Sequence, residues 1–431
     1  MTNPMPKEGI TVDFPKVVRI KQKFHGPMIE PGEIAAAVQE QMSRIALKQA
    51  VTPGMRIALT AGSRGIANIH LIIQAVVRQL QEWGAEPFII PAMGSHGGAT
   101  AEGQVEVLHG YGITESFCGA PIRSSMDVER IGRTPDGVEV YVDRHAWEAD
   151  GIMIIGRIKV HTDFQSPHGY ESGLMKMAAI GMGKHKQALA LHHHGVPGIR
   201  DMMPEVAKVV LDKANILAGI GIVENASEQT AVIEAMTAEQ IPIREKELLK
   251  LSASYMPSLP VEDLDILMVD EIGKNHSGTG MDTNIIGRVR IHGVSDFDKP
   301  RIKYVIAGDL SEESHGNALG IGLADITTKR LFDKVDFQKT NENVITSTFL
   351  HRAMIPIIMA NDREAVETAM KANWGIEPVK ARFARIHSTL HLEHLYVSES
   401  LLPEIRGRAD IEIVGEPEPM RFDEHGNFTA W

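Results

Sequence analysis

The chain has 431 residues, of which 43% are hydrophobic and 23% charged, so it has enough apolar mass for globular cores and is not an intrinsically disordered protein. Its 44 basic and 56 acidic residues give a net charge of −12, and Lys and Arg are not clustered, which disfavours a nucleic-acid partner. At about 150 residues per domain, the length predicts two domains.

The cellular compartment is predicted from cysteine use and hydropathy. Cys118 is the single cysteine, so an internal disulfide and a CxxC metal site are excluded. No run of about 18 apolar residues occurs, and the sequence starts without a basic and apolar leader pattern. We therefore expect a cytoplasmic protein without a membrane partner.

The first predicted elements form a β-α-β unit. An apolar run at 56–61 predicts a strand, apolar residues at helical spacing from 66 to 80 predict a helix, and 88–90 predicts a second strand. Parallel strands joined by a crossover helix place their C-terminal loops at one edge of the sheet, where ligands of open α/β folds bind. The loop GSHGGAT at 94–100 is expected at that edge.

Further apolar runs at 151–155 and 215–223 continue this pattern, and the first leads directly into the histidine-bearing segment RIKVHTDF at 157–164. A proline-containing, polar segment then indicates a domain boundary near 260. The elements predicted beyond it are strands at 264–269, 302–307 and 353–359, a Gly-rich loop at 273–282 and a helix near 316–330.

The predicted fold class is therefore α/β, with two α/β domains, mainly parallel sheets and an active-site cleft between the domains. We expect the N-terminal domain over 1–262, which the polar C-terminal segment 400–431 could rejoin, and the C-terminal domain over 263–399.

Several common catalytic motifs are absent. Each GxG lacks the third glycine of a dinucleotide-binding loop, and Gly273-Lys274 is followed by Asn275 instead of the Ser or Thr of a P-loop. HExxH and GxSxG are also missing. The sequence therefore disfavours a common dehydrogenase, NTPase, zinc protease or serine hydrolase.

Histidines are the informative residues, because imidazole titrates near neutrality and binds borderline metals. Most of the 19 histidines are expected to be ordinary surface or core residues. His96, however, lies among small residues at a strand end, and His161 directly follows a strand. Both are candidates for acid/base catalysis or metal binding.

The Met-rich segment 171–195 offers two further candidates. Lys176 is either a snorkelling lysine on a buried helix or a desolvated, nucleophilic amine that could hold a cofactor covalently. The triplet His192-His193-His194 is either a solvated turn or the source of one metal ligand, because three adjacent helical histidines cannot all face one ion.

An ordered set of motifs resembles the nickel-dependent lactate racemase family of 2-hydroxyacid racemases and epimerases, which carry a nickel-pincer nucleotide. The resemblance runs from about Arg56 to Ser398 and suggests a member outside the lactate racemase subgroup. The motifs are TAGSRGI (60–66), MGSHGGAT (93–100), KVHTDF (159–164), ESGLMKMAAIGMGKHK (171–186), EIGKNHSGTGMDTN (271–284) and ARIHSTLHLEHLYVSESLL (384–402).

The resemblance implies roles for individual residues. His96 and His161 match the two acid/base residues that act on opposite faces of the substrate, and His192 matches the nickel ligand. Lys176 matches the lysine that can be joined to the cofactor, and Arg64, with Ser63 beside it, matches a position near the cofactor or substrate. Proteins of cofactor biosynthesis would act upstream.

The implied reaction inverts C2 of a 2-hydroxyacid by removing and returning a hydride. The C2 proton is too weakly acidic for simple deprotonation by histidine, so an oxidised, planar intermediate flanked by two bases is the easier route. The substrate carboxylate needs local cations or amides, since the protein is acidic overall. The second domain supplies Lys274, Asn275, Arg288 and Arg290, and its segment 282–290 would help to close the site.

The sequence departs from the lactate racemase subgroup in three places. Gly97-Gly98 replaces an arginine-proline pair, IIGR at 285–288 replaces an aromatic-Gln pair followed by lysine, and five extra residues separate His161 from Lys176. The extra residues introduce His168 as a rival for the role of His161. We expect a substrate other than lactate, such as a longer or polyhydroxylated acid of the aldonate type.

Two other classes stay open on the sequence. One is a metal-dependent hydrolase or lyase in which His161, Asp163 and one histidine of the 192–194 triplet hold a metal ion. The other is a nickel-binding protein without catalysis that uses the triplet alone. The oligomeric state has no signature in the sequence.

Overall fold

The computed structural model describes residues 13–24, 26–429 and 431, and divides into two compact units. The central unit spans the described residues from Gly26 to Met256, and the terminal unit combines the described residues up to Phe24 with Pro257–Trp431. Both units are α/β, with mainly parallel sheets, as predicted. No helix among the described residues combines the length and apolarity needed to cross a bilayer.

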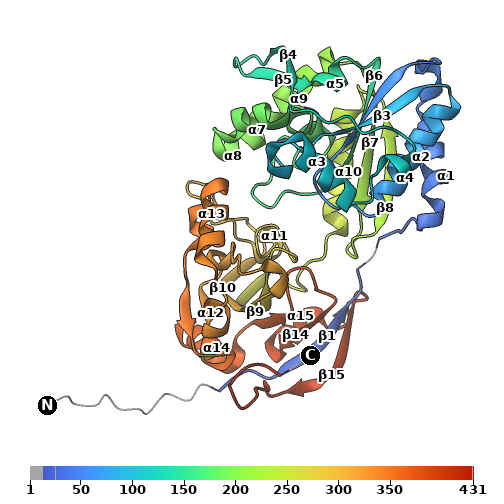
Figure 1. Cartoon of the computed structure of the whole chain (residues 1–431). Coiled ribbons are helices and arrows are strands. Elements are labelled where there is room, and N and C mark those ends of the chain that lie inside the picture. Colours follow the sequence, from blue (N-terminus) through green and yellow to red (C-terminus); the bar gives the residue numbers. More distant parts are fainter. Residues whose placement is uncertain (1–12, 25, 430) are drawn as a thin grey trace. The chain divides into compact units, whose positions relative to one another are not determined.

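The central unit is built on a five-stranded sheet in the order β3-β2-β6-β7-β8, in which the last strand alone runs antiparallel to its neighbour (Figure 1). The strands are β2 (Arg56–Ala61), β3 (Glu86–Pro91), β6 (Gly151–Arg157), β7 (Ile216–Glu224) and β8 (Thr230–Met236). Nearly every residue of these strands is buried, which is why they appear in the sequence as continuous apolar runs.

Helices cover both faces of this sheet, and a small hairpin, β4 (Val128–Arg133) and β5 (Glu139–Asp143), is attached to it. Gly219 and Gly221 of β7 let side chains of α6 and α10 approach closely, since an added Cβ would lie 2.7 Å from Leu174 and 3.2 Å from Leu248 respectively. The helices are α1 (Ile34–Arg44), α2 (Ile69–Glu82), α3 (Ala101–Gly110), α4 (Glu115–Cys118), α5 (Arg144–Trp147), α6 (Leu174–Lys176), α7 (Lys184–His192), α8 (Gly195–Pro197), α9 (Met203–Lys213) and α10 (Ile241–Tyr255), with π-helical turns at Met177–Gly181 and Gly198–Met202.

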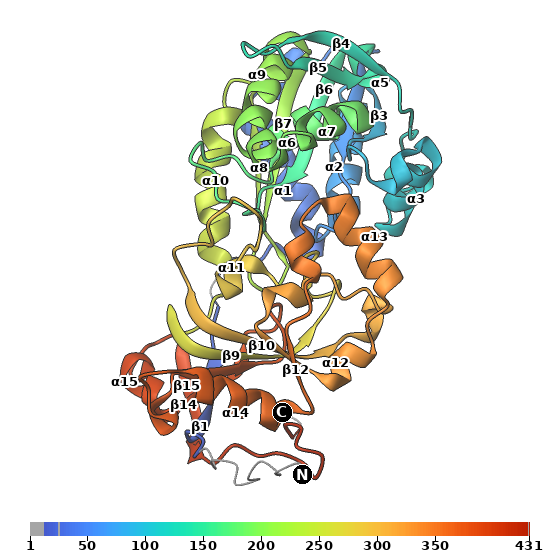
Figure 2. The same ribbon diagram turned by 90° about the vertical axis from the view of Figure 1, so that its left-hand side faces the viewer.

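The terminal unit contains an eight-stranded sheet in the order β12-β11-β10-β9-β13-β14-β1-β15 (Figure 2). The first five strands are parallel and the last three are added antiparallel. The strands are β1 (Val17–Gln22), β9 (Asp263–Ile272), β10 (Arg301–Leu310), β11 (Ile326–Thr328), β12 (Ile357–Met359), β13 (Phe383–Ile386), β14 (His394–Ser398) and β15 (Ile411–Glu418).

Five α-helices accompany this sheet and divide its core between two faces. Ala365, Val366 and Met370 of α14 pack with Ile266 and Met268 of β9, whereas other helices pack with the alternate residues of the same strand. The helices are α11 (Thr283–Ile286), α12 (Lys329–Asp333), α13 (Phe337–Ser347), α14 (Asp362–Ala372) and α15 (Leu402–Ile405).

The chain termini depart from the predicted domain boundaries. β1 lies between β14 and β15, with Ile20 facing Leu395 and Ile413, so the described residues before 25 belong with the C-terminal half of the chain. Residues 400–429 and 431 also belong to the terminal unit and do not rejoin the central one. Antiparallel pairing between distant segments has no local sequence signature, which is why the pattern along the chain missed it.

The helix expected near 316–330 is wrong. The segment instead contains a 3-10 turn at Ile321–Leu323, β11 and the start of α12. Gly316 and Gly320 both have positive φ, and a Cβ at Gly320 would lie 2.0 Å from the carbonyl oxygen of Thr279. Gly320 therefore allows two backbone segments to approach closely, and the two glycines interrupt the apolar spacing that predicted a helix.

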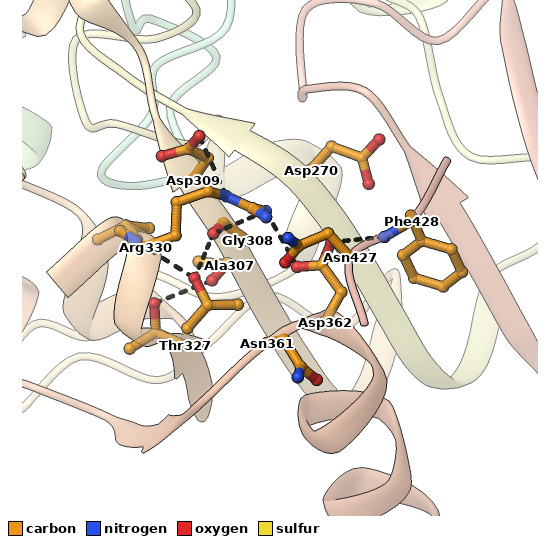
Figure 3. Close-up of polar contacts among 12 residues, drawn as sticks. Asp270, Ala307, Gly308, Asp309, Thr327, Arg330, Asn361, Asp362, Asn427 and Phe428 are labelled. Atoms are coloured by element: carbon orange, nitrogen blue, oxygen red, sulfur yellow. Dashed lines mark hydrogen bonds and ion pairs between the residues drawn. The ribbon is translucent and has the colours of Figure 1, made fainter. Parts of the chain in front are cut away.

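A polar cluster ties the C-terminal segment to the terminal sheet (Figure 3). Arg330 donates to Asp362 at 3.0 Å and to the carbonyl of Gly308 at 3.2 Å, and it lies 3.2 Å from a carboxylate oxygen of Asp309. The second carboxylate oxygen of Asp362 accepts the Phe428 amide at 2.9 Å. Arg330 of α12 thus links β10 to α14, and Asp362 links α14 to the chain end.

Candidate functional site

The histidine loops of the central unit follow the carboxyl ends of its parallel strands, as the sequence predicted. The loop after β3 carries His96, and its shape requires glycine. Gly97 has φ +65°, and a Cβ there would lie 2.7 Å from backbone atoms of Gly103 and Gln104. The loop therefore folds back onto the first turn of α3, a packing that a side chain at position 97 would prevent.

His96 has one ring nitrogen engaged and one available. Its Nδ1 lies 2.9 Å from the carbonyl oxygen of Met93, which can only accept, so Nδ1 carries the proton and Nε2 of the neutral ring is a free base. Desolvation lowers the pKa of His96 despite the bond to Met93, and the positive charges of Arg64 and Lys176 lower it further. His96 is thus held in the neutral form that a general base needs.

His161 lies beyond the end of β6 and contacts the Lys176 amine. Its Nε2 is 2.9 Å from Nζ of Lys176, its ring stacks on Phe164 at 4.5 Å between centroids, and its backbone amide donates to Glu171 at 2.6 Å. The Asp163 amide donates to Nδ1 of the ring at 3.1 Å. Because Nδ1 accepts this bond, the neutral ring carries its proton on Nε2 and donates it to an uncharged amine.

The charge state of Lys176 agrees with that bond. Burial lowers the pKa of Lys176 to about 8; Asp163 and Glu171 oppose the shift and Arg64 adds to it. The side chain belongs to α6, a short turn that begins where the buried carboxyl group of Glu245 accepts the Met175 amide at 2.8 Å. A lysine amine with this pKa has a much larger neutral, nucleophilic fraction near physiological pH than an ordinary lysine.

His192, at the end of α7, belongs to the same group of side chains. Desolvation lowers the pKa of His192, and the charges of Lys176 and His96 lower it further, whereas Asp163 raises it. These mutual effects link the predicted residues His96, Lys176 and His192, and the bond to Lys176 adds His161.

The neighbouring candidates have other contacts. All three histidines of the 192–194 triplet are exposed, and His193 and His194 pack edge to face, with ring centroids 5.6 Å apart. His168 is also exposed and lies 3.4 Å from Asp201, so the structure brings His161, and not His168, to the lysine. Within the part of the chain that the structure describes, no three His, Cys, Asp or Glu side chains are grouped to hold a metal ion.

Arg64 and Ser63 lie in the turn after β2. Arg64 is exposed, yet its charge lowers the pKa of both His96 and Lys176, so its guanidinium lies near the two. The carbonyl of Ser63 accepts the Tyr111 hydroxyl at 2.9 Å, which fixes the turn that presents the arginine.

The substrate-binding residues predicted in the terminal unit are largely engaged within that unit. Lys274 donates to the Gly278 carbonyl at 2.7 Å and to Asn343 at 2.9 Å, and Asn275 accepts the Ser311 hydroxyl at 2.7 Å. These contacts shape the Gly-rich loop.

Arg288 is 7% exposed and donates to Asp325 and to the carbonyls of Ile302 and Lys303, which makes it a structural cation of the terminal unit. It also lines a hollow of about 420 Å³ near the amino ends of β9 and β10. Arg290 shares Asp325 but is more exposed. The local sequence carried no signal that Arg288 would be buried. The expected cleft between the domains stays a prediction.

Sequence analysis missed Glu171 and Gln104, which shape this site, and named Asp163 only as a metal ligand of the hydrolase or lyase alternative. Glu171 accepts the backbone amide of His161, and the Asp163 amide donates to the His161 ring. Both acidic residues stand in the motifs that drew attention to His161 and Lys176. Gln104 donates to the carbonyls of Gly94 and His96. An acidic residue close to a candidate histidine is a usable signal, whereas a glutamine on the following helix gives none.

Comparison with known proteins agrees with this geometry. Residues 12–200, which include all the predicted site residues of the central unit, match the model of the lactate racemase N-terminal domain. This part of the chain is therefore similar to the N-terminal domain of lactate racemase. No curated protein sequence matches it.

Two solved structures are similar in fold. The lactate racemase apoprotein from Thermoanaerobacterium thermosaccharolyticum is 12% identical, with a TM-score of 0.52, and the match covers 87% of this chain and 99% of that one. A structural genomics protein from Thermotoga maritima is 14% identical, with a TM-score of 0.50 and coverage of 86% and 99%. At such identities the likeness concerns the fold.

Proposed function

We propose that this lactate racemase-like chain is an isomerase that inverts C2 of a 2-hydroxyacid by hydride transfer, using a nickel-pincer nucleotide and two histidines as acids and bases. The observation that carries the proposal is the contact of 2.9 Å between His161 and the Lys176 amine, whose pKa is lowered to about 8. The electrostatic coupling of His96 and His192 to the same lysine supports it.

The donor set fits such a cofactor. The neutral fraction of the Lys176 amine would suit a bond to a thioacid arm, neutral His192 offers an imidazole nitrogen to nickel, and Arg64 with Ser63 offers a cation and a backbone turn to an anionic group. When bound, the nucleotide would supply a pyridinium ring that accepts and returns a hydride. Proteins of cofactor biosynthesis would have to provide it.

The two histidines would divide the proton transfers. His96 presents a free Nε2, so it can accept the substrate hydroxyl proton without first losing a partner. His161 carries its proton on Nε2, because its Nδ1 accepts the Asp163 amide, so it would serve first as the acid that donates this proton and afterwards as the base. Two bases are needed because inversion requires a proton acceptor for either enantiomer.

The substrate would be held by local cations in an acidic protein. Arg64 in the central unit and Lys274 and Arg290 in the terminal unit are the candidates for the carboxylate, whereas Arg288 is already saturated. Gly97 removes the bulk beside His96 that the lactate racemase subgroup carries. We therefore propose a longer or polyhydroxylated acid, such as an aldonate, in place of lactate.

Reconstitution tests this function directly. The purified chain would be loaded with the nickel-pincer nucleotide, and its intact mass, absorbance and nickel content measured, before chiral analysis of lactate, longer 2-hydroxyacids and aldonates. We expect a mass addition and inversion of the longer acids. Activity with a metal ion alone would favour the hydrolase or lyase, and nickel bound without nucleotide or turnover would favour a nickel-binding protein.

A further inference from the structure

Gln104 is a fully buried glutamine on α3 that bonds to the backbone of the His96 loop. Its Nε2 donates to the carbonyl of Gly94 at 3.0 Å and to the carbonyl of His96 at 3.2 Å. Both amide protons therefore point to the loop, one on each side of Ser95. The contact is made to the backbone, so it fixes the path of the chain on both sides of the bend.

Lys184 determines which way the Gln104 amide faces. Its Nζ is 3.1 Å from Oε1 of Gln104, donates to the carbonyl of Pro91 at the end of β3, and lies 3.1 Å from the Asp143 carboxylate. The ammonium thus hydrogen-bonds to Pro91 and Gln104 and forms an ion pair with Asp143. A flipped amide would place its NH₂ group against the ammonium, so the lysine excludes that orientation.

The loop that Gln104 and Lys184 contact carries His96, the candidate acid/base residue. His96 donates from Nδ1 to the Met93 carbonyl, and this bond leaves Nε2 as the free base. Met93 and His96 lie between Pro91, which the lysine holds, and Gly97, whose backbone packs on Gly103. The loop is thus anchored at its start by Lys184, in its middle by Gln104 and at its end by the glycine contact.

We propose that Gln104 is a positioning residue for His96, with Lys184 and Asp143 orienting it, so that the Nδ1–H tautomer and the direction of Nε2 are set by a buried cation on α7. This inference rests on the proposed function only for the meaning of His96 as an acid/base residue. Gln104 itself does not touch the reacting atoms.

Two substitutions at Gln104 separate donation from packing. Gln104→Met removes both polar atoms at similar volume, and Gln104→Glu keeps the contact to Lys184 but places an acceptor against two carbonyls. Gln187→Met is the matched control, because Gln187 is equally buried and accepts the Tyr141 amide, but does not touch the His96 loop. Thermal unfolding shows whether the three variants lose comparable stability.

The first readout is the tautomer of His96 in the apoprotein, followed by ¹⁵N NMR of histidine-labelled protein and assigned by loss of the signal in His96→Ala. We expect the Nδ1–H form in the wild type and in Gln187→Met, and a mixed or Nε2–H form in both Gln104 variants. The second readout is turnover of the loaded enzyme: kcat should fall up to about 100-fold in the Gln104 variants, with KM little changed.

An unchanged His96 signal in Gln104→Met and Gln104→Glu overturns the inference, as does an equal change in Gln187→Met. A wild-type signal in Gln104→Glu alone would also overturn it, since donation to the loop would then be unnecessary. If the loaded wild type inverts no 2-hydroxyacid, the proposed function fails, while the NMR comparison still decides whether Gln104 positions His96.

Discussion

Lys176 and Lys184 lie on neighbouring turns of the central unit, in the same Met-rich segment, and have different partners. Lys184 is completely buried but faces the Asp143 carboxylate and two further acceptors. Lys176 is bonded to a histidine ring in place of a carboxylate. Burial lowers the pKa of both amines, yet only Lys184 has an anion beside it at 3.1 Å.

The difference shows what turns a buried lysine into a structural or a reactive group. An ammonium group that forms an ion pair and donates hydrogen bonds to further acceptors stays charged and rigid. A histidine that already accepts on its other ring nitrogen favours the neutral amine, which keeps a lone pair for chemistry.

Lys184→Met should cause the largest loss of stability. Removing the ammonium leaves the Asp143 carboxylate buried without its cation, which typically costs about 3–5 kcal/mol in the free energy of unfolding. Denaturant titration measures it. The double variant Lys184→Met with Asp143→Asn should recover part of the loss, and equal instability of single and double variants would show that the charge pair is not the cause.

His161→Ala should reduce turnover of the loaded enzyme by about 10²–10⁴-fold, because a general acid/base is removed from one face of the substrate. His168→Ala is the matched control: His168 is exposed and its carboxylate contact is to Asp201. Chiral analysis of the product with time measures both. Silencing by His168→Ala with a tolerated His161→Ala would mean that the five extra residues had been misread.

Lys176→Met should lose retention of the nucleotide while its unfolding free energy changes by less than about 1 kcal/mol, because no buried carboxylate is left without its cation. Intact mass after reconstitution checks retention. His192→Ala should instead lose nickel and keep the mass addition, so metal analysis separates the two. Full activity of the wild type without any mass addition would reduce Lys176 to an electrostatic contact.

The smallest expected effect is the pH dependence that Lys176 gives to the free energy of unfolding. The unfolded amine titrates at 10.5 and the folded one at about 8, so between these values the unfolded chain holds more protons, and stability rises with pH. The slope of the unfolding free energy against pH should therefore differ between the wild type and Lys176→Met.

Acylation of Lys176 should also reach half its maximal rate near pH 8, whereas surface lysines continue to gain reactivity at higher pH. Mass mapping after brief treatment with an acylating reagent measures this. A Lys176 profile identical to that of the exposed Lys186 would contradict the lowered pKa.

The strands that position the site were predictable because their signal is local. Buried parallel strands such as β2, β6 and β9 are continuous apolar runs, and a parallel sheet with crossover helices must place the loops after them on one edge. The histidine loops of 94–100 and 157–164 could therefore be assigned to the carboxyl ends of strands from the sequence alone, and the family model that matches residues 12–200 agrees with the motif order there.

Tertiary structure alone decided where β1 pairs, that Arg288 is saturated, and which of two similar lysines has a carboxylate beside it. Pairing, desolvation and counter-ions depend on residues far away in the chain: Asp143 lies on β5, Lys184 on α7 and Gln104 on α3. Hydrophobic periodicity records which face of an element is buried, but it does not record which charge the fold brings against that face.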